Sequence, residues 1–187
     1  LGEEIVDGSV SMRMIKPCSF DMCFLFQELG NKVINYSIMF VPIVLGVEIS
    51  RFVITGAVQF NILSFVLFFV SLQLAYLINF YFNVCYGFLA FFLKNLWGTN
   101  LIKDVIVGFL SGSTIPLAFM PDVLQTVLTY LPFASLSYTP VMIYMNMYSP
   151  LQIAFSMLLQ ALWLAVFVLV SKLIWHFAMK HLCIQGG

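Results

Sequence analysis

Charged side chains are scarce in this sequence. Of its 187 residues only 9% are Asp, Glu, Lys or Arg, while 62% are hydrophobic. Soluble domains carry about 25% charged residues, so these few charges could not cover so much apolar surface in water. The composition therefore excludes a soluble globular protein and predicts an all-α integral membrane protein. Because the formal net charge is zero, no nucleic-acid partner is expected.

Groups that carry chemistry are missing from the apolar runs. No Asp, Glu, Lys, Arg or His lies in the central part of a run of spanning length, which argues against a proton-coupled carrier and an intramembrane enzyme. There is no Gly-rich phosphate-binding loop, so we expect neither catalytic nor cofactor-binding residues. Cys18 and Cys23 are irregularly spaced and lack nearby His, so no metal site is expected and the thiols are expected to be reduced.

Four apolar runs approach the length of about 20 residues that a bilayer-spanning helix needs. The predicted spans are residues 33–49, 57–80, 104–120 and 151–172. Together they predict one transmembrane domain over residues 1–187.

The distribution of Lys and Arg sets the predicted topology. The region 52–93 has room for one span or two. One span leaves only Arg51 outside, whereas two would also move Lys94 and Lys103 outside. Because Lys and Arg collect on the cytoplasmic side, a single span is favoured, and the segments 1–32 and 173–187 are then cytoplasmic.

The outer segment 121–150 has no Lys or Arg, yet it remains apolar. Apolar residues at helical spacing predict a short amphipathic helix over Val123–Leu131. Prolines before and after it interrupt any longer helix. Irregular backbone at membrane depth survives only when it is buried in protein or lines a wet cavity, so we predict a re-entrant or interfacial helical hairpin.

Polar or small residues line one face of the second predicted span. They are Asn61, Ser64, Ser71, Ala75 and Asn79. Such a face either hydrogen-bonds a neighbouring helix or lines a substrate path, and the helix-packing interpretation is favoured.

Three motifs carry a family resemblance. They are IVDGSVSMRMIKP from Ile5 to Pro17, FLSGSTIPLAFMP followed by LPFASLSYTPVMIY, and the ending IQGG. The chain resembles the membrane subunit of type-2 ATP-binding-cassette exporters, in the branch called ABC-2 family transporter protein. One departure is Asn146, which stands where the family pattern has Gly.

The resemblance implies six spans in a full subunit, so we expect this chain to be N-terminally truncated and to lack the first two. It implies that residues 1–32 form a coupling segment that docks on a separate ATPase. The coupling candidates are Glu3, Glu4, Asp7, Gly8, Arg13, Lys16 and Pro17. The candidates for an outer hairpin or gate are Gly112, Pro116, Pro121, Pro132, Phe133, Pro140 and Tyr144.

The expected function is that of a permease subunit in a bacterial plasma membrane. Two permease subunits, identical or related, would form an export path among membrane lipids for an amphiphilic cargo. Separate ATP-binding-cassette ATPase subunits would hold ATP and Mg, and this chain would be no enzyme. The alternatives are a non-transporting scaffold or sensor subunit and an ion-coupled secondary carrier.

Overall fold

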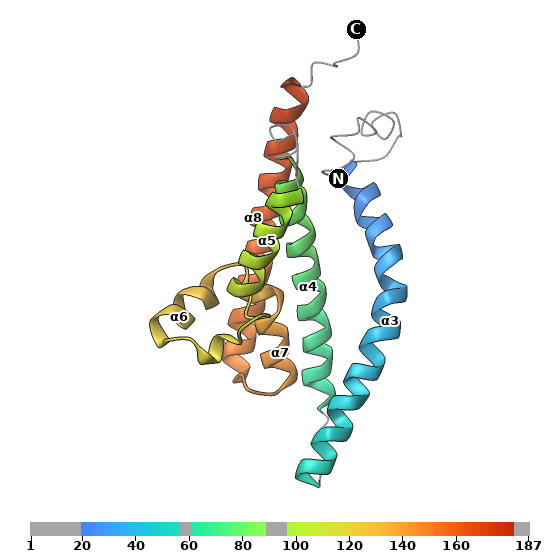
Figure 1. Ribbon diagram of the computed structural model, residues 1–187, viewed down its shortest axis with the longest axis vertical. Coiled ribbons are helices and arrows are strands. Elements are labelled where there is room, and N and C mark those ends of the chain that lie inside the picture. The colour runs from blue at the N-terminus through green and yellow to red at the C-terminus, as the bar shows by residue number, and fades with distance from the viewer. Residues whose placement is uncertain (1–19, 57–60, 89–96, 182–187) are drawn as a thin grey trace. The chain divides into compact units, whose positions relative to one another are not determined.

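The described part of the chain is entirely helical in its regular structure. The computed structural model describes residues 20–56, 61–88 and 97–181. In chain order the elements, with η marking a 3-10 helix, are α3 (Phe20–Thr55), α4 (Ile62–Gly87), α5 (Trp97–Leu110), η2 (Leu117–Phe119), α6 (Asp122–Tyr130), η3 (Ala134–Leu136), α7 (Tyr138–Tyr144) and α8 (Pro150–His181) (Figure 1). They form two compact units, with α3 in one and α4 to α8 in the other. The predicted all-α class is confirmed for these residues.

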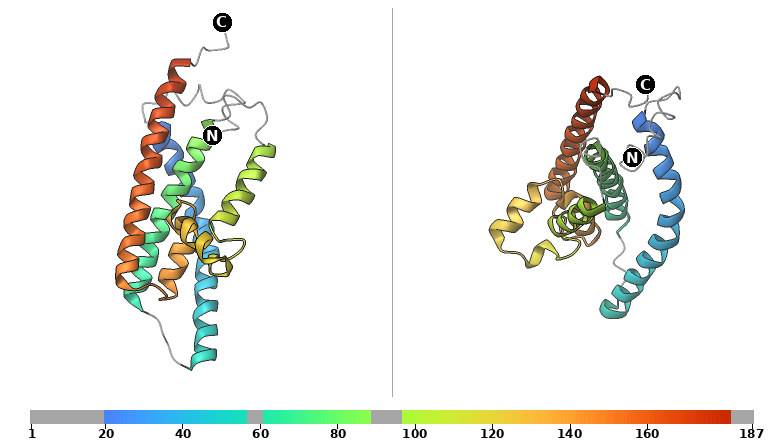
Figure 2. Two further views of the ribbon diagram at one scale, coloured as in Figure 1. Left: turned by 90° about the vertical axis from the view of Figure 1, so that its left-hand side faces the viewer. Right: turned by 45° about the horizontal axis from the view of Figure 1, so that its top comes forward.

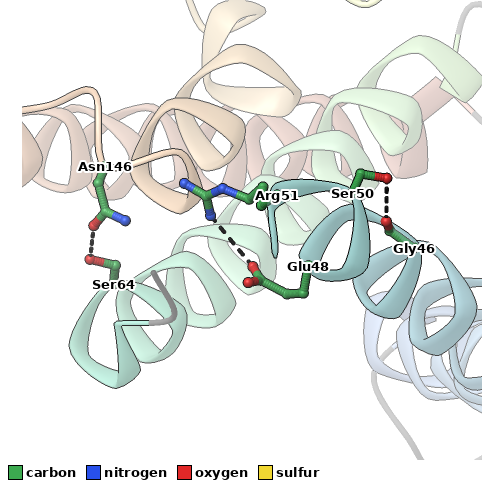
Figure 3. A network of polar contacts seen from close by, with 6 residues as sticks. All are labelled: Gly46, Glu48, Ser50, Arg51, Ser64 and Asn146. Carbon is green, nitrogen blue, oxygen red and sulfur yellow. Dashed lines mark hydrogen bonds and ion pairs between the residues drawn. The ribbon is translucent and has the colours of Figure 1, made fainter. Parts of the chain in front are cut away.

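The helix α3 is continuous over 36 residues. It contains the predicted span 33–49 but begins at Phe20, so the helix extends into the predicted coupling segment. Near its end Arg51 lies 3.4 Å from the Glu48 carboxylate (Figure 3). Arg51, which the predicted topology leaves outside, is therefore paired with an acidic residue one turn earlier in its own helix.

Two cysteines can be compared with the sequence-based expectation. Cys23 is disulfide-bonded, which corrects the expectation of a reduced thiol at this position. Spacing along the chain does not reveal such a bond, because pairing depends on the distance between Cα atoms in space. Cys85 in α4 is not in a disulfide, and its Sγ lies 3.8 Å from the carbonyl oxygen of Phe167.

Among the described residues, two helices are long and apolar enough to cross a membrane. They are α4 and the part of α8 from Pro150 to His176, and they correspond to the predicted spans 57–80 and 151–172. Within the ambiguous region 52–93, the described residues after the end of α3 at Thr55 form one long helix, α4, which ends at Gly87 rather than residue 80. The count of four spans stays a prediction.

The helices α4 and α8 lie side by side and run in the same direction (Figure 2). Phe82 of α4 packs on Phe167 of α8 with 5.7 Å between ring centroids, and Phe88 packs on Trp175 at 5.8 Å. The helix α5, which lies between them in the chain, runs the other way (Figure 2), and the predicted topology stays a prediction.

The third predicted helix, 104–120, differs from the structure. The helix α5 runs from Trp97 to Leu110, so it starts earlier and ends ten residues sooner than predicted. Gly112 follows with a φ of 76°, and the backbone N–H groups of Ser113 and Thr114 both donate to the Gly108 carbonyl at 3.2 Å. A left-handed glycine of this kind ends helices because it has no Cβ to clash.

The predicted hairpin, residues 121–150, contains α6, η3 and α7. The helix expected over Val123–Leu131 is α6, which follows Pro121 and stops at Tyr130 before Pro132. A small apolar core holds this region together; its buried members are Leu117, Met120, Leu128 and Ala134. The segment is therefore a folded element with its own core.

Candidate functional site

The hairpin packs back along α8. The Nε2 of Gln160, roughly three turns or about 15 Å into α8, donates to the carbonyl of Ser135 at 2.9 Å. Farther along α8, the indole N–H of Trp163 donates to the Tyr130 carbonyl at 3.0 Å. In the views of Figures 1 and 2, α7 lies beside the first half of α8. If α8 begins at the outer edge of the bilayer, then Gln160 lies about 15 Å deep, which is about half of the roughly 30 Å hydrocarbon core.

We define the tip of the hairpin as residues 132–135. Aromatic rings pack around this tip. Pro132 is buried, and Phe133 meets Phe82 of α4 edge-on with 5.6 Å between ring centroids. Phe82 also contacts Phe167 of α8 edge-on at 5.7 Å. Edge-to-face pairs of this kind are favourable beyond their buried area. The tip is thus inserted against both long helices.

The returning arm of the hairpin is tied to the start of α4. The hydroxyl of Ser64 donates to Oδ1 of Asn146 (Figure 3), and Tyr144 packs on Phe68 with 5.2 Å between ring centroids. Asn146 has a φ of 56°, a backbone conformation that Asn tolerates better than most side chains. The Gly of the family pattern fits the same backbone need.

The polar residues predicted on one face of the second span differ in their burial and in their contacts. Asn61 precedes α4 and is exposed, whereas Ser64 and Ser71 are 8% and 0% exposed and bond other elements of this chain. Asn79 is half-buried and accepts a hydrogen bond from Asn83 at 3.0 Å. Ser64 bonds Asn146, which follows α7, and Ser71 bonds Gln160 of α8. Both interpretations of this face, helix packing and path lining, stay predictions.

Sequence reasoning missed a polar cluster between α5 and α4. Lys103 Nζ donates to Oδ1 of Asn83 at 2.7 Å and lies 4.9 Å from the ring centroid of Tyr86. Its side chain is only 16% exposed, whereas that of its ion-pair partner Asp104, at 3.3 Å, is 70% exposed. The predicted topology has Lys103 just before the third span, whereas in the structure Lys103 lies in the middle of α5. In the sequence, this polar cluster is indicated by the spacing of Asn79 and Asn83, which lie one helical turn apart.

The hairpin and gate candidates fall into two groups. Pro116 and Pro121 are exposed and flank η2, while the buried or half-buried group faces the protein interior and consists of Gly112, Pro132, Phe133, Pro140 and Tyr144. A Cβ placed on Gly112 would lie 3.0 Å from Leu117 Cγ, so this turn also needs glycine for space.

Tyr148 lies between α7 and α8, close to the end of the hairpin. Burial and the neighbouring Tyr138 raise the pKa of Tyr148 to about 12. The phenol therefore stays neutral over the whole physiological range, and the hairpin contributes no negative charge there.

The coupling candidates Glu3, Glu4, Asp7, Gly8, Arg13, Lys16 and Pro17 lie outside the described residues. Among the described residues, no group of three or more His, Cys, Asp or Glu could hold a metal ion. The contacts just described position helices and a hairpin, and they place no acid, base and nucleophile together.

Comparisons with known proteins give one match. The family model described as ABC-2 family transporter protein matches residues 1–186. No curated protein and no solved structure matched. Since the match spans nearly the whole chain, this protein belongs to the ABC-2 transporter family, whose permeases are membrane transport components rather than catalysts.

Proposed function

We propose that this chain forms part of the substrate path of an ATP-driven exporter, together with a second permease subunit. The family match over residues 1–186 carries this proposal, because ABC-2 membership implies association with ABC ATPase subunits. ATP binding and hydrolysis then occur on the partner. The permease contributes two conformations between which the ATPase shifts the population.

The hairpin supports a role at the outer end of that path. Its tip contacts α4 and α8 through Phe133 and Ser135, which buries irregular backbone in protein, as the interior of a membrane requires. In our proposal the hairpin closes the path on the outer side. Its exposed apolar side chains, such as Val123 at 79% and Val127 at 53%, suit an amphiphilic cargo and the surrounding lipid.

The partner ATPase provides the direct test. The full-length permease, coexpressed with a candidate ATPase and purified in detergent, should retain that ATPase and raise its rate of ATP hydrolysis. The double reversal Arg13→Glu with Lys16→Glu should reduce retention at least about tenfold, because both cations belong to the proposed docking segment. Lys172→Glu, a reversal in the exposed C-terminal part of α8, is the matched control and should retain the ATPase.

The outcomes separate the alternatives. A permease that binds no ATPase on coexpression would contradict the proposal. Binding without cargo-dependent flux in vesicles would favour a scaffold or sensor. Flux driven by an ion gradient in the absence of ATP would favour a secondary carrier. Export predicts ATP-dependent accumulation of cargo inside inside-out vesicles.

A further inference from the structure

Gln160 is a fully buried amide that joins three elements. Its side chain is 0% exposed. The Oε1 atom accepts a hydrogen bond from the Ser71 hydroxyl of α4 at 3.0 Å. The Nε2 atom donates to the Ser135 carbonyl of η3 at 2.9 Å and to the Ser71 carbonyl at 3.3 Å. An amide has one oxygen and two N–H donors, so both ends of this side chain are paired.

The hydrogen bonds of Gln160 are directional, whereas the aromatic contacts around them are not. Packing between Phe133 and Phe82 resists separation, but apolar contacts tolerate sliding of one element along another. Hydrogen bonds weaken steeply as their angle departs from linear. Bonds from one side chain to both Ser71 and Ser135 therefore fix the register of the hairpin tip against α4 and α8.

A buried network of this kind resists partial release. Ser71 and Ser135 are 0% and 1% exposed, so the Ser135 carbonyl is shielded from water while the hairpin is seated. Withdrawing the hairpin would leave one Nε2 N–H of Gln160 unpaired in a buried site, which is far costlier than losing an exposed hydrogen bond.

We propose that Gln160 is a positioning residue that holds the hairpin tip in place, so that the hairpin, α4 and α8 move as one body. The proposal deepens the proposed function and rests on it for the statement that this body borders the transport path. It implies that the path opens by movement of this body against other parts of the transporter, and that the hairpin does not swing away from α8.

Thiol accessibility in membranes tests the proposal. The reporter Ser135→Cys keeps the backbone carbonyl that Gln160 bonds. In cells that express the full chain, a small membrane-impermeant thiol reagent added outside should leave position 135 unlabelled, relative to the parent with its native cysteines. Adding Gln160→Met, which conserves an unbranched side chain but removes both polar ends, should raise the labelling rate about tenfold or more, because the opened hairpin becomes more populated.

Two controls separate positioning from general stability. Gln73→Met makes the same change at an exposed position of α4 and should leave position 135 protected. The reporter Ser171→Cys lies in α8 at a site 1% exposed, where the hydroxyl donates to the Val168 carbonyl of its own helix. Because the predicted topology puts this position near the cytoplasmic end of α8, the two reporters are compared in permeabilised cells, where position 171 should remain protected when Gln160 is replaced.

Three results would overturn the proposal. They are labelling of position 135 while Gln160 is intact, unchanged protection of that position in Gln160→Met, and equal labelling of positions 135 and 171 in Gln160→Met. The first shows that the hairpin leaves its seat, the second that Gln160 does not hold it, and the third that the whole bundle loosens. None of these results alters ATPase copurification, so this proposal and the proposed function can fail independently.

Discussion

At the scale of single residues, Asn146 meets two demands at one position. Its backbone has a φ of 56°, and its side chain accepts the hydrogen bond from Ser64. Asn146→Gly should remove only the hydrogen bond, whereas Asn146→Ala should also place a Cβ in a left-handed conformation, which costs about 1–2 kcal/mol. Thermal unfolding in detergent should therefore give a Tm about 2–8 °C lower for Asn146→Ala than for Asn146→Gly.

Ser64→Ala is the matched control for the hydrogen bond. It removes the bond to Asn146 without touching the left-handed backbone, so its Tm loss includes the full loss from that bond. If Asn146→Ala were as stable as Asn146→Gly, the backbone explanation for the Gly of the family pattern would be wrong.

At the scale of helices, Lys103 docks α5 on α4. Its ammonium group bonds Asn83 at 2.7 Å and is 16% exposed, whereas Asp104 beside it is 70% exposed. Lys103→Met should leave the Asn83 oxygen without this donor and cost about 1–3 kcal/mol. Asp104→Asn removes only an exposed ion pair worth about 0–1 kcal/mol. Tm in detergent should fall by about 2–12 °C for Lys103→Met and by no more than about 4 °C for Asp104→Asn. Equal losses would refute the docking role.

The helices also show which features of a sequence predict structure and which do not. The prolines at 121 and 132 delimit α6 to within a residue, because proline restricts the backbone on both of its sides. The end of α5 escaped prediction, since the apolar residues 115–120 continue the run in the sequence and the stop depends on the left-handed Gly112. Gln160 is one of two amides, with Gln152, in the apolar run 151–172, and only the fold reveals that Gln160 meets Ser71 and Ser135.

At the scale of the whole molecule, the charge pattern and the packing make one topological prediction. Parallel α4 and α8, with α5 between them in the chain and running in the other direction (Figure 2), place the segment just before α8 on the side opposite to the end of α4. The predicted topology, in which Lys94 follows the second span on the inner side, makes that end of α4 cytoplasmic. Met147, which is 64% exposed and lies between α7 and α8, should therefore face the outside.

An impermeant thiol reagent can decide this orientation. Met147→Cys should be labelled from outside in intact cells, because the side chain is exposed and close to the outer ends of both long helices. Ser11→Cys, in the predicted coupling segment, should react only after the membrane is permeabilised. The reversed pattern would place the hairpin on the ATPase side, where it could not close an outer exit, and would remove the structural basis of the proposed gate. Protection of both positions in intact cells would equally contradict an exposed outer position for Met147.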